Sequence, residues 1–237
     1  MNKYTGSALA ALLLFAAAPV LAAPSAAIMA AVADAGRPDA DKAADASRKP
    51  AETLDFAGVK PGDKIAELAP GGGYFTRVLA KAVGANGKVY TYAPARPGAP
   101  PAMPVAPNVT PLNGPYADFA VPEAVDVVFT ARNYHDFQNA MPDMTGFNRK
   151  VFAALKPGGV YFILDHAAAA DAADDVHMAL HRSKEAAARR EAEAAGFRFV
   201  ASSDLLRHPE DDKTKRVFDS GEHNATDQYI LKFEKPR

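Results

Sequence analysis

The chain contains no cysteine in its 237 residues. This absence excludes disulfides, a thiol nucleophile, a cysteine-bound metal and a cysteine-linked lipid anchor. A single large hydrophobic core can stabilise a chain of this length without disulfides, so the absence restricts the chemistry more than the location. The length fits one α/β domain of ordinary size with at most a short arm.

The sequence also lacks an excess of charge of either sign. It has 27 Lys and Arg against 28 Asp and Glu, a net charge of −1, and the basic residues are scattered instead of forming a stripe. A surface of this kind is not built to follow a phosphate backbone, so no nucleic-acid partner is expected. A Gly-x-Ser-x-Gly elbow is missing as well, which argues against a serine hydrolase.

No charged residue occurs between Lys3 and Asp34. Within this stretch an apolar run over residues 8–22 ends in small residues that suit a cleavage site, which is the layout of a secretory signal peptide. We therefore predict that residues 1–22 are a signal peptide and that the protein is exported, to the periplasm or outside the cell. The alternative is an uncleaved anchor, but prolines at 19 and 24 disfavour a spanning helix, and we expect no stable membrane span after cleavage.

A glycine cluster, Gly71-Gly72-Gly73, stands at the centre of the sequence pattern. The apolar run Ile65–Leu68 before it predicts a strand, Tyr74–Val83 after it has helical spacing, and Gly87–Tyr92 predicts a second strand. Such a strand, turn and helix lets backbone N–H groups approach a ligand closely, because glycine has no Cβ. The plain alternative is a surface turn that needs positive φ.

The remaining pattern divides the chain into an arm, residues 23–49, and a domain, residues 50–237. For the arm we expect a mobile start followed by a short helix or loop. Its charged residues are either solvated or folded over a ligand mouth; the candidates for the mouth are Arg37, Asp45, Arg48 and Lys49.

Hydrophobic periodicity predicts further elements in the domain. Helices are expected from Pro50 and over 144–155 and 181–195, and strands over 109–112, 125–130, 160–164, 197–206 and 226–233. The proline-rich segment 93–111 excludes a regular crossover helix at that place. Strands alternating with helices predict an α/β fold with a mostly parallel sheet.

Several motifs together resemble class I S-adenosylmethionine (SAM)-dependent methyltransferases. Glu67 is followed by Ala69-Pro70-Gly71-Gly72-Gly73, similar to that family's acidic residue and Gly-x-Gly-x-Gly, with Ala69 in place of the first glycine. The motifs VDVVFTARNYHDF, LKPGG and AGF follow in order, and the PGGGY and NYHD sequences resemble an exported methyltransferase-like subgroup. The resemblance implies a Rossmann-like fold with seven strands in the order 3-2-1-4-5-7-6, the last antiparallel. It also implies SAM as cofactor and a small-molecule methyl acceptor.

The resemblance also implies which residues bind the cofactor. They are Glu67, Pro70, Gly71, Gly72, Gly73 and Asn133. The family's acid for the ribose hydroxyls is replaced here by Ala93, and Pro115 stands where an acid often meets the adenine, which leaves Asp118 as a possible substitute. Loss of a charged acceptor costs about 1.5–3 kcal/mol of binding unless another group replaces it.

Methyl transfer needs alignment of the reacting atoms and, for a protonated acceptor, a base. His135 is the first candidate for the base, with Tyr134 beside it and His166 on the next strand end. Alternatively, His135 and Asp136 only cap a loop. Asn133, Asp136, Asp165 and His166 could imitate the metal ligands of some O-methyltransferases, but no tight two-histidine spacing occurs, so we predict no metal.

A second function class stays open at this point. Export separates the protein from the cytosol where SAM is made, and Ala93 removes an expected cofactor contact. Both features suit a non-catalytic ligand-binding protein built on a methyltransferase scaffold.

Overall fold

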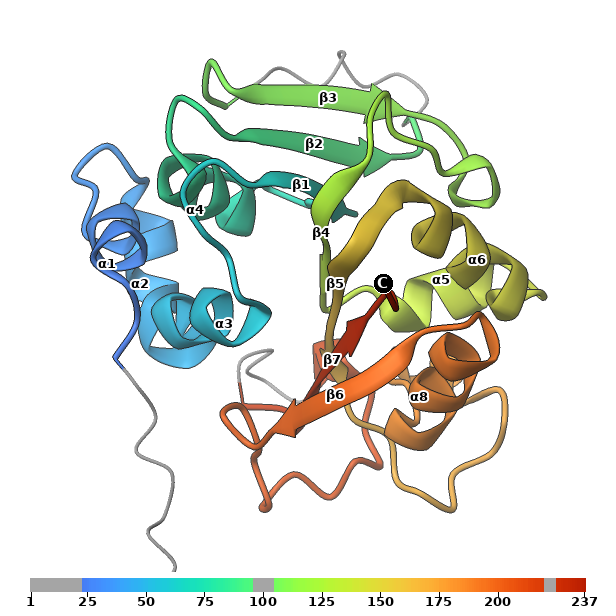
Figure 1. Ribbon diagram of the computed structural model, residues 1–237. Helices are drawn as coiled ribbons and strands as arrows, with labels where there is room; N and C mark the ends of the chain where they lie inside the picture. Colours follow the sequence, from blue (N-terminus) through green and yellow to red (C-terminus); the bar gives the residue numbers. More distant parts are fainter. Residues whose placement is uncertain (1–22, 96–104, 220–224) are drawn as a thin grey trace, which may run out of the picture.

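The computed structural model describes residues 23–95, 105–219 and 225–237, and its centre is a seven-stranded sheet (Figure 1). The strands are β1 (Lys64–Leu68), β2 (Lys88–Ala93), β3 (Val109–Asn113), β4 (Val125–Ala131), β5 (Leu155–His166), β6 (Arg198–Ser203) and β7 (Gln228–Glu234). Their order is β3-β2-β1-β4-β5-β7-β6, and β7 pairs antiparallel with both β5 and β6 while the other pairs are parallel. The predicted fold class and strand order are confirmed.

Helices cover both faces of this sheet. The α-helices are α1 (Ala26–Val32), α2 (Asp39–Arg48), α3 (Pro50–Ala57), α4 (Tyr74–Val83), α5 (Tyr134–Ala140), α6 (Met144–Ala154), α7 (Val176–Leu180) and α8 (Glu185–Ala194). Two 3-10 turns, η1 (Tyr116–Asp118) and η2 (Val217–Asp219), lie in the connections. Figure 1 shows α1, α3 and α4 on one side of the sheet and α5, α6 and α8 on the other.

Each face of the sheet has its own hydrophobic core, because successive side chains of a strand point to opposite faces. In β4, Val127 and Phe129 pack with the α1, α3 and α4 side, whereas Val128 packs with the α5, α6 and α8 side. All three side chains are at most 2% exposed. Burial on both faces explains the uninterrupted apolar run Val127–Phe129 in this strand.

Residues 23–49 form two helices instead of the mobile start that we expected. Ser25 caps α1 by accepting a hydrogen bond from the N–H of Ile28, and Ile28 and Ala31 are buried in the core beside α4. The polar helix α2 has no buried residue, yet Arg37 before it is 3% exposed and bonds both carboxylate oxygens of Asp45. The arm is therefore packed against the domain.

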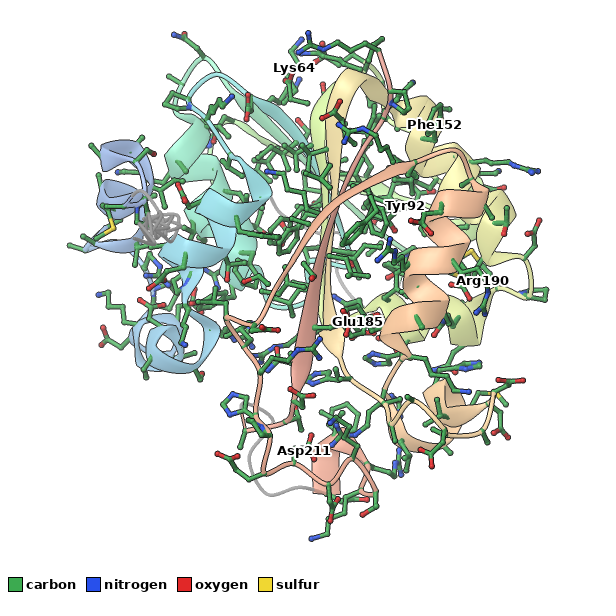
Figure 2. All side chains as sticks on the ribbon, turned by 60° about the horizontal axis from the view of Figure 1, so that its bottom comes forward. Lys64, Tyr92, Phe152, Glu185, Arg190 and Asp211 are labelled. Carbon is green, nitrogen blue, oxygen red and sulfur yellow. The ribbon has the colours of Figure 1, made fainter. Side chains whose placement is uncertain are left out.

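The structure of two other segments did not follow from the sequence pattern. The NYHD motif was expected as a loop, but its last three residues begin helix α5, with Asn133 at the N-cap. The charged segment between β6 and β7 is anchored to the domain through Asp211, which accepts hydrogen bonds from both terminal nitrogens of the fully buried Arg182. Figure 2 shows Asp211 at the end of the molecule opposite Lys64, the first residue of β1.

Among the described residues, no helix combines the length and the apolar character that a bilayer crossing requires. The predicted signal peptide, residues 1–22, lies outside the described residues, and so does the middle of the proline-rich segment, 96–104. Residues 93–95 and 105–111 of this segment contain no helix, and the proline-based prediction for residues 96–104 concerns residues outside the described ranges.

Candidate functional site

The turn between β1 and α4 has the backbone that its glycines predict. Gly71 and Gly73 have φ angles of 56° and 79°, in the left-handed region that glycine adopts without steric cost. Ala69 also has a positive φ, 52°, a conformation that is uncommon for a residue other than glycine. Gly73 is the N-cap of α4, and no side chain caps this helix, so its first N–H groups suit an anionic ligand.

Glu67, the last but one residue of β1, is 3% exposed and accepts a hydrogen bond of 2.6 Å from the Thr76 hydroxyl of α4. Burial raises the pKa of Glu67 to about 7, and the Thr76 bond and the charge of Arg77 only partly oppose this rise. The carboxyl group thus ties the strand to the helix at the base of the turn.

A cavity of about 330 Å³ opens above this turn, and we call it the glycine-turn cavity. It is lined by residues of the arm, the turn and the end of β4: Ala40, Asp41, Ala44, Arg48, Glu67, Leu68, Ala69, Pro70, Gly71, Gly72, Tyr74, Phe75, Ala131, Arg132 and Asn133. Helix α2 forms its cover, held there by hydrogen bonds from Tyr74 to Asp45 and from Arg77 to Asp41. We considered that the charged residues of the arm are either solvated or folded over a ligand site. For Arg48 the structure favours the second alternative, because this residue lines the cavity.

A second cavity of about 490 Å³, which we call the histidine cavity, lies next to the first. Its lining consists of Arg48, Arg132, Asn133, His135, Asp136, His166, His181, Val217 and Phe218. Arg48, Arg132 and Asn133 line both cavities, so the two are neighbours at the carboxyl ends of β1, β4 and β5. In open α/β sheets this edge is where ligands bind.

His135 is held in one orientation by Asp165, which is fully buried at the end of β5. The Asp165 carboxylate accepts hydrogen bonds from the His135 ring Nδ1 at 2.8 Å, from the His135 backbone N–H at 2.7 Å and from the Ser183 hydroxyl at 2.7 Å. With Nδ1 as the donor, Nε2 carries the lone pair and lies 3.4 Å from Asp136 Oδ1.

The charges in this cluster depend on each other. Burial by itself lowers the pKa of His135, but the charge of Asp165 and the hydrogen bond to it raise the pKa above its ordinary value. Burial raises the pKa of Asp165, and the charge and hydrogen bond of His135 bring it below its ordinary value. For His166 burial dominates and lowers the pKa to about 3, so this ring is neutral, with Nδ1 hydrogen-bonded to Thr226 at 2.7 Å.

Unusual backbone conformations gather at the two cavities. Of the five non-glycine residues with positive φ in the described part of the chain, three line them, namely Ala69, Arg132 and His181. Such conformations cost about 1–3 kcal/mol each and persist where the surrounding structure requires them. This distribution marks the edge of the sheet as a functional region.

Most of the predicted site residues line these cavities, but Gly73, which is the N-cap of α4, Tyr134 and Asp118 do not. Tyr134 is fully buried away from them: its hydroxyl donates to Glu191 of α8 and accepts from Asn148 of α6. Burial raises the pKa of Tyr134 well above its ordinary value. The prediction of Tyr134 as a catalytic residue is corrected accordingly, because its neighbour His135 points to the cavity while Tyr134 points into the core on the α8 side.

Asp118 is the second correction. Its side chain is 73% exposed and its carboxylate lies 4.0 Å from the Lys150 ammonium, and it lines neither the two cavities nor the apolar cavity that follows β2 and β3. That third cavity, about 510 Å³, is lined by Pro94, Ala95, Asn113, Gly114, Pro115, Tyr116, Ala117, Ala140 and Met141. No carboxylate among its lining residues replaces the acid missing at Ala93.

Two residues of the site were not predicted from the sequence. Arg132 donates to Gln228 of β7 and lines both cavities, and His181 ends helix α7 with a φ of 53°. His181 is the first residue of the stretch 181–195 that we predicted as a helix, and no local pattern distinguishes it as a site residue. A larger cavity of about 660 Å³, beside α4 and residues 105–108, contains none of the predicted catalytic or cofactor-binding residues, although Arg37 of the arm lines it.

No family model and no curated protein sequence matches the chain. Among solved structures, a SAM-dependent methyltransferase from Aquifex aeolicus is similar over 83% of this chain and 95% of its own, with a TM-score of 0.58 at 17% identity. An arsenic(III) SAM methyltransferase from Chlamydomonas reinhardtii matches 91% of this chain and 75% of its own, with a TM-score of 0.55 at 20% identity. The [4+2]-cyclase SpnF matches 88% of this chain and 91% of its own, with a TM-score of 0.58 at 14% identity. These likenesses show that the chain has the class I methyltransferase fold.

Proposed function

We propose that the protein is a SAM-dependent methyltransferase acting on a small molecule. The observation that carries the proposal is the contact between the glycine-turn cavity and the histidine cavity, which share Arg48, Arg132 and Asn133. A cofactor in the first cavity would present its methyl group toward the second. The SAM-dependent methyltransferases among the structural neighbours support the same conclusion.

The glycine-turn cavity offers suitable groups for the amino-acid end of SAM. The uncapped first turn of α4 and the Arg48 guanidinium favour the carboxylate. The Nε of Arg48 is buried and has no hydrogen-bond partner among the described residues, which is costly unless a ligand supplies one. The buried Glu67 lies in the same lining and favours the ammonium group.

The apolar cavity beyond β2 and β3 is the place for the nucleoside. Its lining is mainly apolar, and Asn113 supplies an amide for hydrogen bonds to the base or ribose. Because Ala93 supplies no carboxylate to the ribose, we expect weaker SAM binding than in an enzyme with that acid.

In the reaction, the acceptor atom donates an electron pair to the methyl carbon as the bond from that carbon to sulfur breaks. The electrons of the broken bond stay on sulfur, so the sulfonium becomes the neutral thioether of S-adenosylhomocysteine. A proton on the acceptor atom passes to a base or to water. The protein contributes mainly alignment of the two substrates in adjoining cavities.

The substitution Gly72→Leu tests the cofactor site. Gly72 lacks a positive φ, and a Cβ at this position would meet no atom within 4 Å, so a leucine there is expected to fold normally and to fill the cavity that Gly72 lines. We expect S-adenosylhomocysteine affinity, measured by isothermal titration calorimetry, to fall more than about 100-fold, or about 2.7 kcal/mol, with an unchanged melting temperature.

Gly36→Leu is the matched control, because Gly36 also lacks a positive φ but lies outside the glycine-turn cavity. It should bind like the unchanged protein. Absence of any SAM or S-adenosylhomocysteine binding to the unchanged protein would refute the proposal.

A ligand-binding protein without methyl transfer is the second candidate, favoured by Ala93 and by the lack of a carboxylate around the nucleoside cavity. The cyclase among the structural neighbours supports it, since that name describes no methyl transfer. Incubation with SAM labelled in the methyl group and a library of small hydroxy, thiol and amine compounds separates the two. Label transfer supports the enzyme, and binding without transfer supports the second candidate.

A further inference from the structure

Three side chains of the histidine cavity bring potential metal-ligand atoms close to one another. These are His135, Asp136 and His181, whose atoms all lie within 4.8 Å of one another. The separation is 3.4 Å between His135 Nε2 and Asp136 Oδ1, and 3.9 Å between Asp136 Oδ1 and His181 Nδ1. Zinc bonds of about 2.0–2.2 Å at tetrahedral angles place ligand atoms roughly 3.4 Å apart, so small side-chain rotations would complete such a site.

We propose that His135, Asp136 and His181 bind one divalent transition-metal ion of the zinc type. Two imidazoles with one carboxylate form one of the known ligand sets of catalytic zinc sites, which keep a position open for water or substrate. Imidazole donors favour zinc over magnesium, which prefers oxygen ligands. This ligand set differs from the one considered for the sequence, because only Asp136 is common to both and His135 and His181 take the place of Asn133, Asp165 and His166.

The hydrogen bonds around His135 support this site. Metal-bound histidines usually donate their other ring N–H to a carboxylate, which fixes the ring and makes the ligand nitrogen more basic. Asp165 accepts this bond from Nδ1 at 2.8 Å, and it is itself fixed by the His135 backbone N–H and by Ser183. The free Nε2 is therefore oriented toward Asp136 before any ion arrives.

The backbone at His181 supports the site in a second way. Its φ of 53° is uncommon for a residue other than glycine, although Asn, Asp and His tolerate it best. The ring also packs edge-on against the rings of His135, at 5.6 Å, and Phe218, at 4.9 Å. The strained backbone thus delivers the imidazole to His135 from a distant segment of the chain.

One contact opposes metal binding and gives the inference a sharp test. The exposed Arg216 side chain donates to His181 Nε2 at 3.2 Å, which places the imidazole proton on Nδ1. Coordination through Nδ1 requires the proton to leave that nitrogen and Arg216 to turn away. Removal of Arg216 should therefore strengthen metal binding.

The open position of the ion would face the cavity that Arg48 and Arg132 also line. Resting on the proposed function, this suggests an acceptor that offers an oxygen or sulfur anion to the ion. Its O–H or S–H proton would pass to water, and the methyl group would then go to the same atom. His135 would in this case act as a metal ligand instead of the predicted base.

The test uses the full chain, stripped of metal with a chelator and titrated with Zn²⁺ by calorimetry in the absence of SAM. We expect one equivalent to bind, and Mg²⁺ at the same concentration not to bind. His181→Asn keeps a residue that tolerates the left-handed backbone and should reduce Zn²⁺ affinity at least about 100-fold. Asp165→Asn should reduce it about 10- to 100-fold, and Arg216→Ala should increase it.

His177→Asn is the matched control, since His177 lies on α7 but outside the cluster, and it should bind Zn²⁺ like the unchanged protein. Equal Zn²⁺ affinity of the unchanged chain and His181→Asn, or an equal loss in His177→Asn, would overturn the proposal. S-adenosylhomocysteine binding is measured on the same variants. A variant that loses Zn²⁺ binding but still binds S-adenosylhomocysteine shows that the metal site is separate from the proposed cofactor site. If the proposed cofactor site is wrong, the unchanged protein will bind Zn²⁺ but not S-adenosylhomocysteine.

Discussion

The two neighbouring cavities are built in different ways. The glycine-turn cavity takes most of its floor from one continuous stretch, Glu67 to Phe75, whose backbone conformation follows from local glycine chemistry. The histidine cavity takes its lining from six places in the chain: the end of α2, the end of β4, the start of α5, the end of β5, the end of α7 and the segment before β7. A local motif therefore made the first cavity predictable, while the second exists only when distant segments pack together.

The buried carboxyl groups of the two cavities, Glu67 and Asp165, also differ in their surroundings. Glu67 is a buried carboxyl group without a cationic partner in hydrogen-bond contact, and burial raises its pKa to about 7. Asp165 is equally buried but has His135 as a partner, and its pKa lies below the ordinary value. The first cavity thus keeps a group suited to a cationic ligand, whereas the second has its charges paired within the protein.

The largest effect on stability is expected for the ion pair that joins the segment around the histidine cavity to a distant part of the chain. Asp211→Asn removes the charge that faces the fully buried Arg182, the residue between His181 and Ser183. An uncompensated buried charge should reduce the free energy of unfolding by about 3–5 kcal/mol, measured by urea denaturation. Asp212→Asn alters an exposed neighbour that accepts hydrogen bonds from Thr214, and this variant should change the free energy of unfolding by less than about 0.5 kcal/mol. Equal effects of the two variants would contradict the conclusion that the histidine cavity depends on the contact between Asp211 and Arg182.

The next largest effect is a pH dependence of stability that is expected from Glu67. Because the folded state holds the proton of Glu67 up to about pH 7 while the unfolded state releases it near 4.5, stability falls as pH rises through this interval. Glu67→Gln should lack this loss and be more stable than the unchanged protein by on the order of 3 kcal/mol at pH 8, with little difference at pH 4. The comparison is made by urea denaturation at each pH. A stability difference that does not vary with pH would show that Glu67 is not held protonated.

The smallest effect concerns the cover that both cavities share. Tyr74→Phe removes the 2.7 Å hydrogen bond from the Tyr74 hydroxyl to Asp45, which helps to hold α2, the helix that carries Arg48. We expect the free energy of unfolding to fall by about 1–2 kcal/mol and amide exchange in α2 to become faster. A double-mutant cycle with Asp45→Ala measures the pair itself, and a coupling near zero would mean that α2 is held by other contacts.

Much of the fold could be predicted from local pattern. Helix Tyr74–Val83 begins and ends where its spacing and flanking glycines place it, and the buried strand over 125–130 was recognisable from its apolar run. The arm was harder, because α2 has a polar sequence with no buried residue and is held in place by ion pairs to other elements. Tyr134 and Asp118 failed as site residues because a motif specifies neighbours in sequence but not the direction in which each side chain points.

The sequence by itself determined the elements and the glycine turn, since backbone sterics and hydrophobic period act over a few residues. It also indicated that the ends of β1, β4 and β5 carry the chemistry, because parallel strands end at one edge of the sheet. Only the tertiary structure decided that His181 meets His135 and Asp136, and that Asp165 lies buried behind them. These contacts join segments that are far apart in the sequence. The distance between them is set by the packing of the whole domain, so it cannot be predicted from local sequence patterns.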